Sequence, residues 1–208
     1  MKFFSSIIFV LFGHIAVAQL NVVTLTKADI PASIHYTGHI ISAVKFIDAE
    51  GEHIVITTET GEVKTKAKDS DGRDADLFAY CYRTDNGTPI LAWQVHDFIK
   101  DCGEDILANY VPNTFAVTDL NNDGKAEVWL MYKVTCQGDV SPPTMKIIMY
   151  SGSKKYAARG TAKTQISDKD YMGGKYVFDD AFKTGPEAFR KYADALWQKN
   201  LMQKWGGK

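Results

Sequence analysis

The sequence predicts a mainly β fold of the α+β class, an antiparallel β-meander or sandwich followed by a C-terminal amphipathic helix. Three observations support this prediction. Short runs rich in β-branched and aromatic residues recur along the chain, and turn signals such as Asp48–Gly51 and Asp85–Gly87 separate them. Only the last stretch, after Gly185, carries apolar residues at helical spacing.

The N-terminus predicts export. Residues 1–18 contain a lone Lys2, an apolar run from Ile7 to Phe12 and a small-residue end at Ala16-Val17-Ala18, the pattern of a cleaved secretory signal. A membrane anchor is the weaker interpretation, because the run is far shorter than a bilayer span. We therefore expect a signal peptide at 1–18, one β-rich domain over 19–208, and a periplasmic or secreted protein with no stable membrane insertion after cleavage.

The first half of the chain predicts two hairpins and a polar edge. The acidic segment Asp69–Asp76 lies between the polar edge and the second hairpin. Its carboxylates could be taken for a calcium-binding loop, but their irregular spacing and Arg73 favour a solvated turn. The expected strands are 34–47, 53–58, 63–68, 77–84 and 90–99.

The second half predicts a short irregular or helical piece at Glu104–Tyr110, a hairpin, and a proline loop at Val140–Pro143. Strands are expected at 145–150 and 156–162, and 171–178 is expected to be irregular and then extended.

A helix is expected from about Pro186 to Lys204. Thr184-Gly185-Pro186-Glu187 fits a capping box with proline early in the first turn. The stripe that we expect to pack on one sheet face consists of Phe189, Tyr192, Ala193, Leu196 and Trp197.

The most informative motif is the loop from Asp119 to Glu127. Ca2+ takes six to eight oxygen ligands, so a binding loop needs carboxylates and carbonyls at alternating positions around a tight bend. The predicted ligands are the side chains of Asp119, Asn121, Asp123 and Glu127 and the backbone carbonyl of Lys125, with Gly124 allowing the bend.

This loop is not an EF-hand. Position twelve is Leu130 where an EF-hand has a bidentate Glu, and the flanks, 114–117 and 128–132, predict strands and not helices. Over about twenty residues the loop resembles the strand-loop-strand calcium loops of FG-GAP repeats. The simpler alternative, an Asn-Asp-Gly hairpin turn, leaves Asp119, Asn121 and Glu127 unexplained.

Three cysteines follow the signal. We expect Cys102 to pair with Cys136, because they bracket the two strands of the calcium hairpin, and Cys81 to be a small buried residue. A catalytic Cys81 is disfavoured, since no histidine with an orienting partner is recognisable beside it.

No catalytic motif is recognisable, so an enzyme is the less favoured class and no catalytic or organic-cofactor residues are predicted. His35 and His39 share one strand face but lack a third zinc ligand, and His96 and Asp97 are expected on opposite faces. Without Lys2 the chain has 23 Lys and Arg against 25 Asp and Glu, a balance of about −2 that gives no reason to expect nucleic acid.

Several stretches together resemble an exported Bacteroidota family labelled surface polysaccharide biosynthesis proteins; they are 74–80, 117–133, 138–142, 145–150 and 173–176 with the terminal helix. The resemblance implies an envelope protein linked to surface glycans. Our first hypothesis is a non-catalytic, calcium-stabilised domain that binds an envelope glycan or envelope protein. The rivals are an enzyme acting on surface polysaccharide, which needs a cleft with converging carboxylates or histidines, and a protein-binding adaptor.

Overall fold

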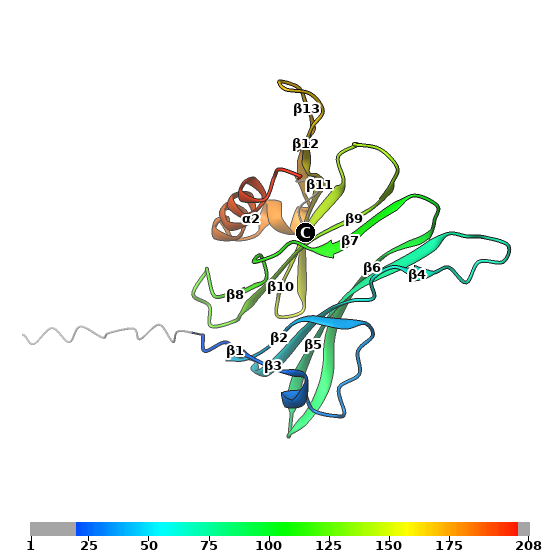
Figure 1. Cartoon of the computed structure of the whole chain (residues 1–208). Coiled ribbons are helices and arrows are strands. Elements are labelled where there is room, and N and C mark those ends of the chain that lie inside the picture. Colours follow the sequence, from blue (N-terminus) through cyan, green and yellow to red (C-terminus); the bar gives the residue numbers. More distant parts are fainter. Residues whose placement is uncertain (1–19, 204–208) are drawn as a thin grey trace, which may run out of the picture.

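The structure, a computed structural model, describes residues 20–203 and consists mainly of antiparallel sheets (Figure 1). Two six-stranded sheets face each other, and a C-terminal helix covers the outer face of the second. The predicted fold class is confirmed. The predicted signal peptide, 1–18, lies outside the described residues, and no helix among residues 20–203 is long and apolar enough to cross a membrane.

The first sheet contains the predicted early hairpins. β5 is its central strand and pairs with β6 along its whole length and with β3 and β4. Its strands are β1 (Val23–Thr24), β2 (His39–Asp48), β3 (Gly51–Glu59), β4 (Val63–Lys64), β5 (Arg73–Asp85) and β6 (Thr88–Cys102), and a 3-10 turn, Lys27–Asp29, follows β1.

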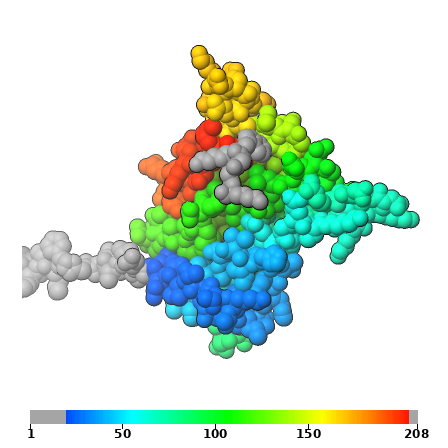
Figure 2. Space-filling model, in the orientation of Figure 1, coloured from blue at the N-terminus to red at the C-terminus, as the bar shows by residue number. Residues whose placement is uncertain are grey.

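The second sheet contains the predicted calcium hairpin. β9 is central, pairing with β7, β8 and β10, and a small separate β12–β13 hairpin projects from the body at the top of Figure 2. Its strands are β7 (Asp105–Tyr110), β8 (Ala116–Thr118), β9 (Glu127–Gln137), β10 (Thr144–Ser151), β11 (Lys154–Thr161) and β14 (Tyr176–Phe178), and the small hairpin is β12 (Lys163–Gln165) with β13 (Tyr171–Gly173).

Three apolar clusters hold these layers together. The largest lies between the sheets, where Val55, Leu77 and Trp93 of the first meet Leu130 and Ile148 of the second. The other two cover the outer faces. The residues before β2 pack on part of the first sheet, and the helices α1 (Asp180–Thr184) and α2 (Glu187–Lys199) pack on the second.

The helix confirms the predicted stripe. Phe189, Ala193 and Trp197 are buried against β9, β10 and β11. The prediction of a capping box is wrong. Thr184 ends α1 and its hydroxyl donates to the carbonyl of Asp180. The residue before α2 is Pro186, whose side chain cannot accept a hydrogen bond. The helix also ends at Lys199, before the predicted Lys204, because the chain then turns so that Leu201 and Gln203 can pair with Lys163.

Two further expectations need correction. The segment 104–110 is not irregular or helical, because Asp105–Tyr110 forms the strand β7 along β9. The strand expected from Ile34 begins only at His39, because Gly38 has a φ of 92° and turns the chain. At 104–110 tertiary pairing overrides the local pattern, whereas at Gly38 the local backbone conformation delays the start of the strand.

The predicted disulfide between Cys102 and Cys136 is present, with Cα atoms 5.9 Å apart. Cys102 ends β6 in the first sheet and Cys136 lies in β9 of the second, so the bond links the two sheets. Cys81 is buried and unpaired, as expected.

Candidate functional site

The loop between β8 and β9 has the strand-loop-strand form that the sequence predicts. Its polar side chains bind the backbone of the bend. The carboxylate of Asp119 accepts hydrogen bonds from the N–H groups of Asp123 and Gly124, each at 3.1 Å, and Asp123 accepts from the N–H of Lys125 at 2.9 Å. Asn122 and Gly124 take positive φ angles of 55° and 81°, which form the tight bend.

Glu127, the first residue of β9, is fully buried. One carboxylate oxygen, Oε2, accepts hydrogen bonds from the Thr118 hydroxyl at 2.7 Å and the Leu120 N–H at 2.8 Å. The other, Oε1, is buried without a hydrogen-bond partner. Burial, together with the charges of Asp119 and Asp123, outweighs the lowering effect of those two hydrogen bonds and raises the pKa of Glu127 to about 7.

These residues suit a hard cation in their chemistry. Four side chains with oxygen atoms that could ligate a metal, and the Lys125 carbonyl, lie within a nine-residue stretch around one bend. A cation would also give the unpartnered buried carboxylate oxygen a partner. Over residues 20–203, however, no three His, Cys, Asp or Glu side chains converge as a metal-binding group. The carboxylates of Asp119 and Asp123 instead accept hydrogen bonds from the backbone of the loop.

The β2–β3 turn holds this loop against the first sheet. The carboxylate of Asp48 accepts a hydrogen bond from the Ala126 N–H at 2.9 Å, and the Ala49 N–H donates to the Gly124 carbonyl at 2.8 Å. Lys125 Nζ also lies 2.7 Å from a carboxylate oxygen of Glu50. The end of the two sheets beside the β8–β9 loop is therefore joined by three contacts, whereas the disulfide joins them through the far end of β9.

A cavity of about 500 Å³ opens beside this junction. Its size falls within the range of small-molecule sites, and it combines apolar and charged walls. The Trp93 and Tyr150 rings, one from each sheet, stack with centroids 4.2 Å apart. Other lining residues include Phe46, Asp48, Glu50, His53, Cys81 and Arg83.

Three of the lining side chains form a connected series. His53 Nδ1 lies 3.8 Å from Cys81 Sγ, and His53 Nε2 lies 3.0 Å from a carboxylate oxygen of Asp48. The expectation that Cys81 lacks a histidine with an orienting partner is therefore wrong. The β3–β5 register decides this arrangement, because Val55 pairs with Cys81 and places His53, two residues away, on the same face.

A second candidate surface lies on the outer face of the first sheet, where the residues before β2 leave it uncovered. The rings of Phe78 and His96 stack with centroids 4.3 Å apart, and His96 lies 5.2 Å from the ring of Phe98. Phe98 is 48% exposed. We call these three residues the aromatic platform.

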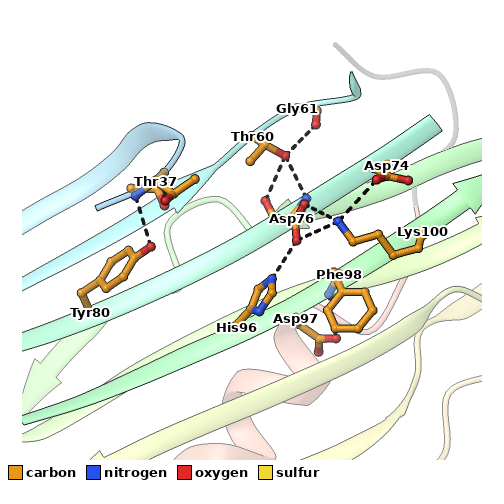
Figure 3. Close-up of polar contacts among 11 residues, drawn as sticks. Thr37, Thr60, Gly61, Asp74, Asp76, Tyr80, His96, Asp97, Phe98 and Lys100 are labelled. Carbon is orange, nitrogen blue, oxygen red and sulfur yellow. Dashed lines mark hydrogen bonds and ion pairs between the residues drawn. The ribbon is translucent and has the colours of Figure 1, made fainter. Parts of the chain in front are cut away.

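Charged residues border the aromatic platform (Figure 3). Asp76 accepts a hydrogen bond from His96 Nε2 at 2.7 Å and pairs with Lys100 Nζ at 2.9 Å, while Lys100 also lies 5.6 Å from the Phe98 ring centroid. Burial would raise the pKa of Asp76, but the hydrogen bonds from His96 and Lys100 and the charge of Lys100 outweigh it and lower the pKa. Asp76 therefore orients the His96 ring of the platform and at the same time pairs with Lys100.

The other residues considered from the sequence do not form metal sites in the described chain. His35 and His39 are exposed. His96 and Asp97 do point to opposite faces, since His96 binds Asp76 and Asp97 binds Lys146. In the acidic segment, Asp74 accepts a hydrogen bond from the Asp101 N–H at 2.8 Å and so orders the backbone.

Comparison of the chain with protein-family models, with curated proteins and with solved structures finds no match.

Proposed function

We propose that this protein is an exported, calcium-stabilised β-domain of the bacterial envelope that binds a surface glycan on its aromatic platform. The metal part of the proposal rests on one observation, the buried and unpartnered Oε1 of Glu127 beside a loop rich in oxygen donors. Leaving a buried polar atom unpaired costs about 1–3 kcal/mol, and a cation removes that cost.

Calcium fits this site better than a transition metal. All the predicted ligands are oxygens, from Asp119, Asn121, Asp123, Glu127 and the Lys125 carbonyl, whereas zinc and copper sites use histidine and cysteine. Because Ala126 and Lys125 also contact the β2–β3 turn, an ordered loop would stabilise the contact between the two sheets.

Thermal unfolding tests the metal part. Calcium at a hundred times its Kd contributes about 2.7 kcal/mol, which for a chain of this size raises Tm by roughly 5–10 °C relative to excess EDTA. Asp123→Ala should abolish that rise. Asp71→Ala, a fully exposed carboxylate in another loop, is the matched control and should keep it. Equal Tm values in calcium and EDTA for the unaltered chain would refute calcium binding.

The glycan part rests on the shape and chemistry of the platform. The rings of Phe78 and His96 stack on each other, and Phe98, which is 48% exposed beside His96, offers an apolar ring on which the C–H face of a sugar can stack. Asp76 and Lys100 at its border supply an acceptor and a donor for hydroxyl groups. The tryptophans Trp93, Trp129 and Trp197, by contrast, lie in the cores.

Binding to an array of bacterial surface oligosaccharides, followed by titration calorimetry of any hit, tests this part. Phe98→Ala should weaken a bound glycan about tenfold, since loss of one stacking contact of about 1.4 kcal/mol corresponds to that factor. Val177→Ala removes an apolar side chain that is 71% exposed on the second sheet and should leave affinity unchanged. Equal weakening by both variants, or binding only to a protein partner, would contradict the glycan assignment.

The resemblance to the surface polysaccharide family agrees with this proposal and suggests its pathway. Deletion of the gene should then alter the surface glycans of the producing cell, and a variant lacking Phe98 should fail to restore them. Restoration by the Phe98→Ala variant would show that the platform has another role.

A further inference from the structure

We propose that Cys81, His53 and Asp48 form a nucleophilic triad that cleaves a small carboxylic ester in the cavity between the sheets. This inference goes beyond the proposed binding function and does not depend on it. It rests on the arrangement of the three side chains, on the cavity that they line, and on the hydrogen bonds that hold the histidine.

The hydrogen bonds determine which nitrogen of His53 is free. Both oxygens of Asp48 are acceptors, because they receive the N–H groups of Glu50 and Ala126 as well as the imidazole. His53 Nε2 must therefore carry the proton that it shares with Asp48. In the neutral ring, the lone pair of Nδ1 then faces the Cys81 sulfur at 3.8 Å.

The orientation of the ring is determined from two further sides. The His53 imidazole stacks on Phe46 with ring centroids 5.0 Å apart and planes 14° from parallel. Asp48 is itself held by backbone N–H groups from two different parts of the chain. A nucleophile beside a base, with the base oriented by a third group, is the general arrangement of covalent catalysis.

The cavity supplies the place for a substrate. Cys81 is only 2% exposed, but it lines the cavity of about 500 Å³ together with Trp93, Arg83 and Ser153. That volume admits a short acyl ester. The apolar wall of Trp93 and Phe46 suits the acyl or aromatic part of the ester, and Arg83 and Ser153 suit its polar part.

Proton transfer to His53 has to accompany the attack. Burial, together with the charges of Asp48 and Glu50, raises the pKa of Cys81 to about 12, so the resting sulfur is a neutral thiol. In the first step the S–H proton moves to Nδ1 while sulfur bonds to the carbonyl carbon. The C–O bond then breaks and the departing alcohol takes the proton, which leaves a thioester.

Water completes the reaction. Nδ1 accepts a proton from water while the oxygen of that water bonds to the thioester carbon. The S–C bond then breaks, and sulfur takes the proton back from Nδ1. The products are a carboxylic acid and the free thiol. No oxidant or reductant enters either step, and all atoms of ester and water are accounted for in the acid and alcohol.

The purified chain incubated with p-nitrophenyl acetate tests the proposal. The chain has three cysteines and two form the disulfide, so Cys81 is its only thiol. We expect release of p-nitrophenolate and, after acid quenching, an acetyl group on the Cys81 peptide in mass spectrometry. Cys81→Ala and His53→Gln should each lower the release rate at least about a hundredfold, the usual contribution of a nucleophile or general base.

His39→Gln is the matched control, because His39 is an exposed histidine of the same sheet outside the cavity, and it should keep the full rate. Circular dichroism establishes that each variant is folded; if His53→Gln is not, Cys81→Ala decides, since it removes only the buried sulfur. A folded Cys81→Ala variant with the wild-type rate, or acetylation on lysines with none on Cys81, would overturn the triad.

Discussion

The carboxylate of Asp48 and the backbone N–H of Ala126, 78 residues apart in the chain, are joined by a hydrogen bond of 2.9 Å. One oxygen of Asp48 holds the end of the calcium-type loop, and the other holds His53 and the N–H of Glu50. A single side chain thus connects the loop, the β2–β3 turn and the cavity. Disturbing it should affect all three.

Asp48→Asn should lower the free energy of unfolding by about 1–3 kcal/mol. The amide can replace only one of the two acceptor oxygens, so its NH2 group faces a buried donor from either Ala126 or His53. Urea unfolding measures the effect. Asp71→Asn, which changes an exposed carboxylate, should stay within about 0.5 kcal/mol, and an equally small effect of Asp48→Asn would contradict the linking role.

Glu127→Gln should act differently with and without calcium. In EDTA the remaining oxygen still accepts from Thr118 and Leu120, and the NH2 group replaces an atom that already lacks a partner, so stability should change by less than about 1 kcal/mol. In millimolar calcium the variant should lose the stabilisation seen in the unaltered chain. Parallel urea titrations in the two buffers check this. Equal losses in both buffers would assign Glu127 a role independent of metal.

Replacing both Cys102 and Cys136 with alanine should cost about 3–4 kcal/mol, the chain-entropy value for a sequence separation of 34. The measurement is urea unfolding with and without dithiothreitol. Reductant should weaken the unaltered chain by a similar amount and leave the double variant unchanged. If the disulfide of the unaltered chain is fully reduced and its free energy of unfolding does not fall, packing alone holds the sheets together at that end.

Asp76 should contribute stability that disappears in acid. Its pKa is lowered in the folded state by His96 and Lys100, so the contribution is complete above the unfolded pKa of about 3.9 and is lost as pH falls through the lower folded value. The stability difference between the unaltered chain and Asp76→Asn should therefore be larger at pH 6 than at pH 2. Chemical unfolding at both pH values measures it, and a difference independent of pH would exclude this linkage. Asp180→Asn, at a carboxylate that is 92% exposed, serves as the control.

The sequence by itself determined the local features of this protein. The turns after Asp48 and Asp85, the β8–loop–β9 form and the buried stripe of α2 follow from residue patterns over a few positions, where period and turn chemistry decide the backbone. The pairing of Cys102 with Cys136 was also expected from the sequence, but it is the pairing of β7 with β9, with Ile106 opposite Cys136, that brings the two cysteines together.

Only the tertiary structure decided which distant side chains meet. The local pattern of 104–110 suggested no strand, yet β9 recruits it as β7. Cys81 and His53 face each other because of the β3–β5 register, and Asp48 reaches Ala126 because the sheets stack with that turn against that loop. Register and stacking depend on the summed burial of whole strands, a quantity that no short window of sequence contains.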